Sequence, residues 1–306
     1  MFLSRLSVWH PEERLTNADL GRMVDTSDEW ITSRVGIRER RRSPADMKVH
    51  QMGARAAKLS LDGRPVELVV CGLSVADYHL PSTANLIAAE VGCGEAAAFD
   101  VRAACSSFVF ALHAMRGLFA LGELRRALLV IPEAYTHVTD YTDRGTCILW
   151  GDAAFACMVT RDAPATPSLE VLDTFIGSRS KDALSIQAPV GGVFTQQGNA
   201  VHAFAIRKMA EVVETSLQRC HLTAQDLAWF VGHQANRGIL DRCCERVGIP
   251  PEKHLSNIEM YGNCGAAGAP SVLAQNLERF RGGDRIAVAT VGSGLSWGGA
   301  LLRARG

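Results

Sequence analysis

The 306-residue sequence lacks any apolar run that reaches the roughly 18–20 residues needed for a transmembrane helix. It also lacks net charge, because 32 basic residues balance 32 acidic ones. A neutral chain gives no electrostatic reason to expect nucleic acid or an anionic membrane as a partner. The first residues, MFLSRLSVWHPEERLT, are interrupted by Arg5, His10 and two glutamates, so they do not resemble a signal peptide.

Paired cysteine motifs are absent as well. No two of the nine cysteines are spaced as CxxC, their number is odd, and most lie inside apolar segments. This pattern fits reduced thiols of a cytoplasmic protein better than a disulfide framework or a zinc site. We therefore expect a cytoplasmic protein without a metal site, in which most cysteines are core residues.

The apolar residues that are present follow two kinds of spacing. Helix spacing occurs at 106–121, 203–220 and 267–280. Short runs of strand length occur at 67–74, 127–133, 153–160, 227–232 and 285–292. Strands that are apolar on both faces and alternate with helices predict a covered sheet in an α/β protein. The proline-containing stretch 162–168 is the best boundary candidate, which gives an N-terminal half, 1–161, and a C-terminal half, 162–306.

The two halves share an order of segments. In the first, a strand is followed by a loop, by FDVRAACSS entering a helix, and by a second strand; in the second, YGNCGAAGAPS takes the corresponding place. Cys105 and the pair Asn263–Cys264 therefore fall at matching positions, each just before a helix start. This repeat predicts two βαβ-rich halves that bring both helix starts to one shared centre.

Cys105 has two interpretations within RAACSSFVFAL (102–112). It can be a small buried residue packed at the start of a helix. Alternatively it is a nucleophile beside the unpaired N–H groups of a helix N-terminus, where the dipole favours the thiolate and lowers the pKa of the thiol. The small residues around it leave room for a substrate. This stretch alone does not decide between the two.

His233 and Asn263 gain meaning only in combination with Cys105. His233 directly follows the apolar strand LAWFV, at the end where α/β sheets commonly bind ligands, and can act as a hydrogen-bond donor or base. Asn263 is an uncharged donor among small residues, able to bind a developing oxyanion. Taken singly, a loop histidine and a turn asparagine are the better interpretations.

Several motifs carry a more specific signal. RAACSS, GHQAN and YGNCGAAGAPS, in this order and spacing, resemble the Cys, His and Asn motifs of the β-ketoacyl-acyl-carrier-protein synthase III family, within the thiolase superfamily. Other stretches resemble further signatures of that family: DTSDEWITSRVGIRER, TDRGTCILWGDAA, QQGNAV and GSGLSWGGALL. The resemblance covers essentially the whole chain. It implies a thiolase-like fold, in which two pseudo-symmetric halves form a five-layered αβαβα sandwich.

The resemblance implies a condensing enzyme. Cys105 would be acylated by an acyl-CoA primer, and a malonyl thioester would then lose carbon dioxide and attack the acyl group, giving a 3-ketoacyl thioester that initiates fatty acid or polyketide synthesis. His233 and Asn263 would bind the enolate oxygen. The backbone N–H groups of Cys105 and Ser293 would form the oxyanion hole. No metal or cofactor is expected, because decarboxylation drives carbon–carbon bond formation.

Residues that match the family's binding motifs are expected to hold coenzyme A. Trp30 and Arg34 would grip the adenine by stacking and hydrogen bonding. Arg144 would provide a further contact on the adenine side. Asn236 would contact the pantetheine arm.

The acyl pocket is expected to include Trp150 and, from the partner in a homodimer, Leu80. Trp150 stands where a phenylalanine is common, and Leu80 stands where many members have a larger aromatic residue. One change narrows the pocket and the other widens it, so the primer length is not predicted.

The face expected to dock malonyl-acyl carrier protein departs from the family's pattern. Gly238 replaces a common arginine, and Glu245 and Arg246 replace paired lysines, which would weaken attraction to an acidic partner. Arg207, Arg237 and Arg242 could restore a basic patch. The departures motivate an alternative, an acyltransferase of specialised metabolism that passes the Cys105 acyl group to another nucleophile. A non-catalytic partner subunit is a third hypothesis, and the intact Cys, His and Asn argue against it.

Overall fold

One mixed sheet runs through the computed structural model, which describes residues 1–306. Its nine strands follow the order β11-β12-β13-β8-β1-β7-β6-β4-β5. The bounds are β1 (Phe2–Trp9), β4 (Leu68–Gly72), β5 (Ala97–Val101), β6 (Arg126–Ala134), β7 (Asp152–Thr160), β8 (Ser168–Ser178), β11 (Trp229–Gly232), β12 (Arg285–Gly292) and β13 (Ser296–Arg305). The α/β class predicted from the sequence is confirmed.

Strand β1 joins the two parts of this sheet. It pairs antiparallel with β7 along most of its length and with β8 through Phe2, Leu3 and Ser4. A register shift between Ser4 and Ser7 interrupts the pairing with β7, and beyond it β1 pairs with β7 alone. The parallel pairs lie on either side of this junction, β4 with β5 and β6, and β11 with β12.

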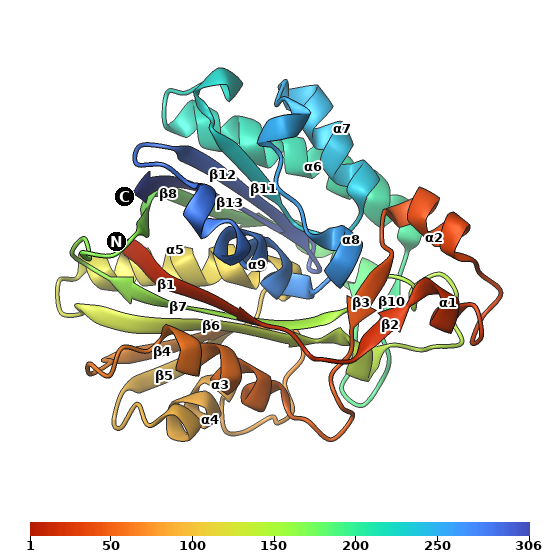
Figure 1. Ribbon diagram of the computed structural model, residues 1–306, viewed down its shortest axis with the longest axis horizontal. Helices are drawn as coiled ribbons and strands as arrows, with labels where there is room; N and C mark the ends of the chain where they lie inside the picture. Colours follow the sequence, from red (N-terminus) through yellow and green to blue (C-terminus); the bar gives the residue numbers. More distant parts are fainter.

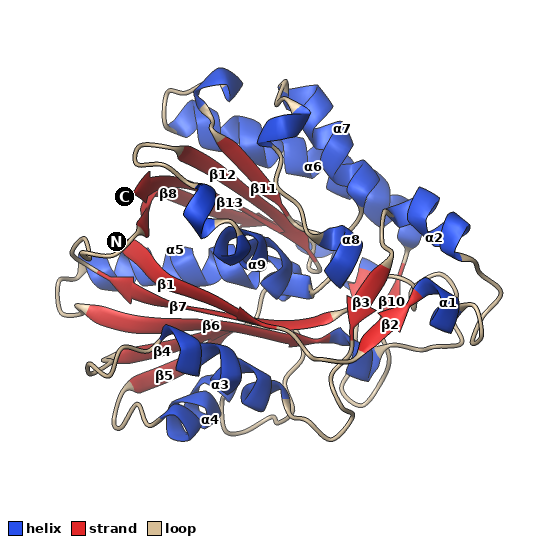
Figure 2. Cartoon of the chain, viewed as in Figure 1, coloured by secondary structure: helices blue, strands red, loops and turns tan.

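Helices cover the two parts of the sheet in layers (Figure 1). The middle layer, α5 (Ser107–Ala120) and α9 (Gly268–Gln275), contacts strands of both parts. The outer layers are α3 (Val49–Ser60) with α4 (Thr83–Val91), and α6 (Gly198–Arg219) with α7 (Arg237–Val247). Figure 2 shows the resulting alternation of helix and strand layers, which agrees with the expected αβαβα order.

Helix α5 shows why the middle layer is buried. Phe108, Leu112, Met115 and Phe119 recur at spacings of four and three residues and are all buried, so one apolar face runs the length of the helix. The sequence prediction of a helix at 106–121 is confirmed to within one residue at each end.

Smaller elements complete the fold beside the strand ends. They are α1 (Asn17–Leu20), α2 (Asp28–Val35), α8 (Ile258–Tyr261) and the short strands β2 (Arg14–Thr16), β3 (Glu39–Arg41), β9 (Ile186–Gln187) and β10 (Thr195–Gln196). No helix is long and apolar enough to span a membrane. Between β7 and β8 the chain runs through residues 161–167, where the sequence suggests the boundary between halves; that division stays a prediction.

Candidate active site

A cavity of about 680 Å³ opens beside the ends of strands from both parts of the sheet, among them β6, β11 and β12. Its walls come from both ends of the chain and include most of the residues singled out in the sequence. Those residues are Cys105, His233, Asn263, Ser293, Trp30, Arg34, Asn236 and Trp150. The cavity therefore unites motifs that lie more than 200 residues apart, as Trp30 and His233 do.

Cys105 reaches the cavity from a tight turn. The 3₁₀ turn η1 (Ala104–Ser106) precedes α5, and Ala104 has a φ of 47°, a left-handed conformation that is costly for a residue with a Cβ. Gly292 packs against this turn so closely that a Cβ there would lie 3.0 Å from the Cys105 nitrogen. A side chain at this position would force the turn to shift, whereas glycine fits without a shift. The Cys105 Sγ lies 3.8 Å from the Tyr135 hydroxyl.

The electrostatic surroundings of Cys105 differ from the sequence expectation. Burial raises the pKa of the Cys105 thiol to about 12, and the nearby Glu133 carboxyl acts in the same direction. The Tyr135 hydroxyl and the thiol's own backbone N–H oppose this only in part. The lowered pKa inferred from the helix start is therefore wrong, because desolvation and a buried acid outweigh the donors at that turn.

Glu133 is a buried carboxyl that the sequence analysis missed. It accepts hydrogen bonds from the Ser74 hydroxyl (2.6 Å), the Ser74 N–H (3.2 Å) and the Ala266 N–H (3.1 Å). Burial nevertheless raises the pKa of Glu133 to about 8. An acidic residue inside the apolar strand ALLVIPE was the available signal, since an unpaired buried acid is rare.

His233 follows the last residue of β11 and is held by its backbone. Its N–H donates to the Ala289 carbonyl at 2.8 Å, and its own carbonyl accepts from the Ala235 N–H at 2.9 Å. Burial lowers the pKa of His233 to about 4, so the imidazole is neutral at physiological pH. Its Nδ1 is buried without a partner, which leaves Nε2 as the ring nitrogen with access to the cavity.

Asn263 is oriented by its neighbours. Its Oδ1 accepts from the Gly265 N–H at 3.0 Å, which leaves its Nδ2 group as a donor without a partner in the chain. Its backbone is tied to both sides of Trp150, since the Asn263 N–H donates to the Leu149 carbonyl and the Gly151 N–H donates to the Asn263 carbonyl. The amide therefore presents N–H groups rather than oxygen to the cavity.

Ser293 lies in the turn between β12 and β13. Its hydroxyl donates to the Ile186 carbonyl at 2.6 Å, which ties this turn to β9. Its backbone N–H, like that of Cys105, donates to no other residue of the chain. Two unused N–H donors therefore border the cavity beside the thiol.

The residues expected to hold coenzyme A lie at the mouth. Trp30 and the exposed Arg34 are on α2, whose N-cap Ser27 accepts from the Trp30 N–H. The Arg144 guanidinium lies over the Trp30 ring, 4.4 Å from its centroid, although Arg144 itself does not line the cavity. Asn236 lines the cavity, but its amide is engaged: it caps α7 through the Gly238 N–H and donates to the Arg34 carbonyl.

Leu80 does not line this cavity in its own chain. Its side chain is 85% exposed, on the loop before α4. Trp150, by contrast, is buried in the wall, where it stacks on Tyr135 and meets Phe194 edge-on. Tyr135 and Phe194 were missed, because neither stands in a motif and their proximity arises only from folding.

Comparison with known proteins places this cavity in a family. Residues 99–180 match the model of 3-oxoacyl-[acyl-carrier-protein] synthase III, and residues 217–304 match its C-terminal model. A curated relative from Deinococcus radiodurans, β-ketoacyl-[acyl-carrier-protein] synthase III 2, is 38% identical over 97% of this chain and 93% of its own length.

Solved structures agree with these matches. The crystal structure of 3-oxoacyl-[acyl-carrier-protein] synthase III from Aquifex aeolicus superimposes with a TM-score of 0.93 at 33% identity, covering 99% of each chain. The priming β-ketosynthase of the R1128 polyketide pathway superimposes with a TM-score of 0.89 at 28% identity, covering 97% of this chain and 94% of its own.

The fold and the matches define a thiolase-fold condensing enzyme, an acyltransferase of the kind that initiates fatty acid or polyketide synthesis. The chain belongs to the β-ketoacyl-acyl-carrier-protein synthase III family. The alternative of an acyltransferase that serves another nucleophile is not favoured by these comparisons.

Proposed function

We propose that Cys105 accepts an acyl group from acyl-CoA and that His233 and Asn263 then serve the decarboxylative condensation. The observation that carries this proposal is the convergence of the three side chains on one cavity, with the Asn263 Nδ2 and a neutral His233 as unused hydrogen-bonding groups. Family membership supports the same assignment.

In the first step the Cys105 sulfur attacks the thioester carbonyl of acyl-CoA. An S–C bond forms to Cys105, the bond to the coenzyme sulfur breaks, and the proton of the Cys105 thiol leaves with the coenzyme thiol. The negative oxygen of the tetrahedral intermediate needs donors, and the unused N–H groups of Cys105 and Ser293 are suited to that task. Because the pKa of the buried Cys105 thiol is high, the thiol is protonated before the reaction. Its proton must therefore be removed as the sulfur attacks.

In the second step a malonyl thioester loses carbon dioxide, and the electron pair of the broken bond forms an enolate. Donors at His233 Nε2 and Asn263 Nδ2 stabilise its oxygen without supplying a competing acid, because the pKa of His233 is low and an amide does not titrate. The enolate carbon attacks the acyl group, and the Cys105 thiolate departs. These steps need no cofactor or metal.

Coenzyme A binds at the mouth in this proposal. The adenine stacks on the Trp30 ring, and the Arg144 guanidinium, which now lies over that ring, either moves away or covers the other face of the base. Arg34 supplies hydrogen bonds. Asn236 acts chiefly as the cap of α7, and reaches the pantetheine arm only by sharing its amide.

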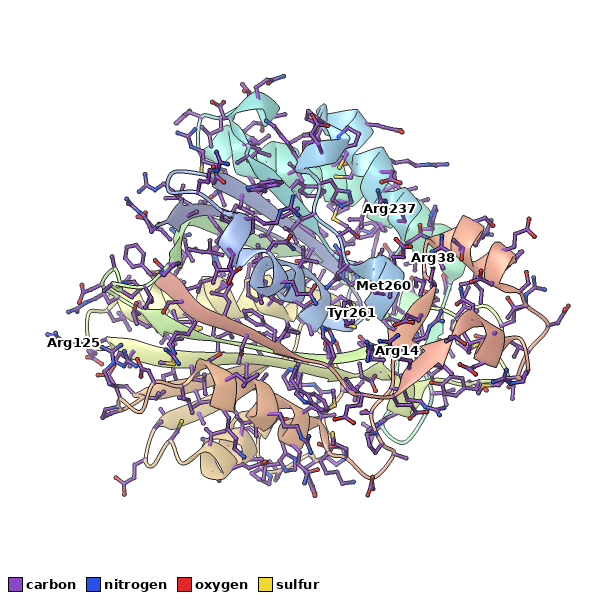
Figure 3. The ribbon with its side chains drawn as sticks, viewed as in Figure 1. Arg14, Arg38, Arg125, Arg237, Met260 and Tyr261 are labelled. Carbon is purple, nitrogen blue, oxygen red and sulfur yellow. The ribbon has the colours of Figure 1, made fainter.

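Malonyl-acyl carrier protein is the proposed second substrate. It would dock on a face that departs from the family's pattern. Arg237 on α7 (Figure 3) is paired with Asp241 at 2.8 Å, and Arg207 lies 3.7 Å from Glu211. Arg242 lines the cavity and, like Arg34, has no acidic partner. Since paired arginines attract an acidic partner less strongly, we expect weak, salt-sensitive docking.

A homodimer in the cytoplasm completes the proposal. Exposed Tyr78 and Leu80 share one loop, which is suited to contact with a second copy, and all nine cysteines are free thiols, as a reducing compartment requires. Molecular mass in solution tests the dimer: a monomer would contradict it.

The central test uses mass spectrometry and product analysis. Acetyl-CoA should add an acetyl mass to the wild-type protein at Cys105, and malonyl-acyl carrier protein should then release carbon dioxide and a 3-ketoacyl product. An acetylated protein that forms no ketoacyl product would overturn the condensation step. If no acyl-CoA adds mass at Cys105, the assignment of Cys105 as the nucleophile is overturned.

A further inference from the structure

One carboxyl group lies between the two turns that carry Cys105 and Asn263. Glu133, near the end of β6, is 0% exposed and does not line the cavity. It therefore has no contact with a substrate there. A buried acid is costly unless hydrogen-bond donors surround it, and Glu133 accepts from three donors in two separate segments of the chain.

One of these donors belongs to the turn of Asn263. The Ala266 N–H, in the 3₁₀ turn Gly265–Ala267, donates to Glu133 Oε1 at 3.1 Å. In the same turn the Gly265 N–H donates to Asn263 Oδ1 at 3.0 Å, so it fixes the direction of the Asn263 amide. Ala266 is 1% exposed, and without Glu133 its N–H would be buried without an acceptor. The turn that orients Asn263 is therefore held at Glu133.

The same turn also packs directly against the carboxyl. Gly265 has a φ of 53°, in the left-handed region that glycine adopts readily, and a Cβ there would lie 3.0 Å from Glu133 Oε1. A change in the group at position 133 therefore reaches Gly265, whose N–H holds the Asn263 amide.

The other two donors belong to Ser74, on the loop after β4. Its hydroxyl donates to Glu133 Oε1 at 2.6 Å, and its N–H donates to Oε2 at 3.2 Å. The Cys105 turn is held differently, because the Ser107 Oγ accepts from the Ala103 N–H at 2.9 Å. Loss of the Glu133 acceptor should therefore disturb the Asn263 turn more than the Cys105 turn.

We infer that Glu133 is a positioning residue for Asn263: its Oε1 fixes the turn that directs the Asn263 amide at the enolate oxygen. This rests on the proposed role of Asn263 in the condensation. Such a role needs an acceptor oxygen rather than a charge, since an amide oxygen can receive the same two hydrogen bonds as Oε1. Substitutions at position 133 can therefore separate the acceptor from the charge.

The experiment compares Glu133→Leu with Glu133→Gln, which both remove the charge beside Cys105. Acetyl mass at Cys105 and formation of the 3-ketoacyl product from a malonyl thioester are measured in one reaction. Glu133→Leu should lower the condensation rate by roughly tenfold or more, because a donor that is slightly misplaced loses much of its effect. Acetylation should change only a few-fold. Glu133→Gln keeps the acceptor and should condense within about threefold of the wild-type rate.

A double-mutant cycle separates positioning from general damage. In the Asn263→Ala background the amide is already absent, so Glu133→Leu should lower the condensation rate by no more than about twofold further. A defect of the whole fold would lower the rate by the same factor in both backgrounds. Glu133→Met replaces Glu133→Leu if that variant melts below the assay temperature, because a flexible apolar side chain fills irregular space.

The outcomes are distinct. The inference is supported if Glu133→Leu loses condensation, Glu133→Gln retains it, and the loss vanishes without the Asn263 amide. Equal losses in Glu133→Leu and Glu133→Gln overturn it, as do a parallel fall in acetylation, an undiminished loss in the Asn263→Ala background, and unimpaired condensation by folded Glu133→Leu. If the wild type is not acetylated, or if Asn263→Ala condenses at the wild-type rate, the proposed function is overturned instead.

Discussion

The start of α5 and the start of α9 are built alike. Each helix follows a short 3₁₀ turn, η1 and η6 (Gly265–Ala267), and each turn carries or follows a buried cysteine, Cys105 in one case and Cys264 in the other. Burial raises the pKa of both thiols. Yet Cys105 lines the cavity, whereas Cys264 donates to the Tyr261 carbonyl at 3.2 Å and packs in the central core.

The difference lies in which residue of the turn meets the cavity. At α9 the residue before the cysteine, Asn263, takes that place, so the same local structure presents an amide instead of a thiol. A helix start and a shifted pKa therefore do not distinguish a reactive cysteine from a core one. Access to a shared cavity does, and variants of the two turns test this directly.

The largest effect is expected from exchanging the two cysteines for alanine. Cys105→Ala should abolish acylation by acetyl-CoA, because no other cysteine lines the cavity. Cys264→Ala should retain it and lose about 1–2 kcal/mol of unfolding free energy for the small core cavity created. Mass spectrometry and thermal denaturation measure the two effects. Equal acylation of both variants would erase the distinction.

Asn263→Ala should separate the two chemical steps. Condensation with a malonyl thioester is expected to fall by roughly 100-fold or more, because a donor to the enolate oxygen is lost. Acetylation of Cys105 should change only a few-fold, since that step uses other donors. Carbon dioxide release and acetyl mass are read in the same reaction. A parallel fall in both would show that Asn263 supports the fold rather than the condensation.

A smaller effect is expected from Glu133, which lies between the two turns. Glu133→Gln removes the acid that helps raise the pKa of Cys105, so alkylation of Cys105 by iodoacetamide should begin at a lower pH than in wild type. Cys264 should remain unlabelled in the folded protein, because it has no access to the cavity. A pH profile of labelling, resolved by peptide mapping, checks both statements.

The smallest effect concerns stability and pH. The pKa of Glu133 rises from 4.5 to about 8 on folding, so the folded state holds a proton that the unfolded state has lost, and this group's contribution to stability decreases as pH rises between these values. Above pH 6.5 the buried histidine His233 no longer opposes the trend. Between pH 6.5 and 8 the free energy of unfolding of the wild type should therefore fall by about 1–2 kcal/mol. Glu133→Gln should not show this decrease. Melting curves at both pH values would contradict this if the two proteins changed equally.

Local patterns predicted part of the regular structure. The expected strands 67–74, 127–133, 153–160, 227–232 and 285–292 correspond to β4, β6, β7, β11 and β12. The helix expected at 203–220 begins earlier, at Gly198, and the one expected at 267–280 ends at Gln275 before a 3₁₀ turn. The strands β1, β8 and β13, which join the two parts of the sheet, were not predicted. Strand β5 and the helices α3, α4 and α7 were also missed.

The candidate site was predictable where chemistry follows from a motif and not where it follows from packing. Cys105, His233 and Asn263 stand in recognisable segments, and the structure brings them to one cavity. Tyr135 and Phe194 are 59 positions apart, so their contact has no local signal. The direction of the Cys105 pKa shift also failed, because it depends on Glu133 and on burial, which the helix start does not reveal.

The pairing of β1 with both β7 and β8 has a mechanical consequence. Cys105 precedes α5, between the two parts of the sheet, and His233 follows β11 at the far end of a hydrogen-bonded frame that β1 makes continuous. Such a frame has no hinge about which the cleft can swing open. We therefore expect the spacing of the reacting groups to be set before any substrate arrives. Entry of the substrate then depends on small displacements at the rim of the cavity, above all that of the Arg144 side chain from the Trp30 ring.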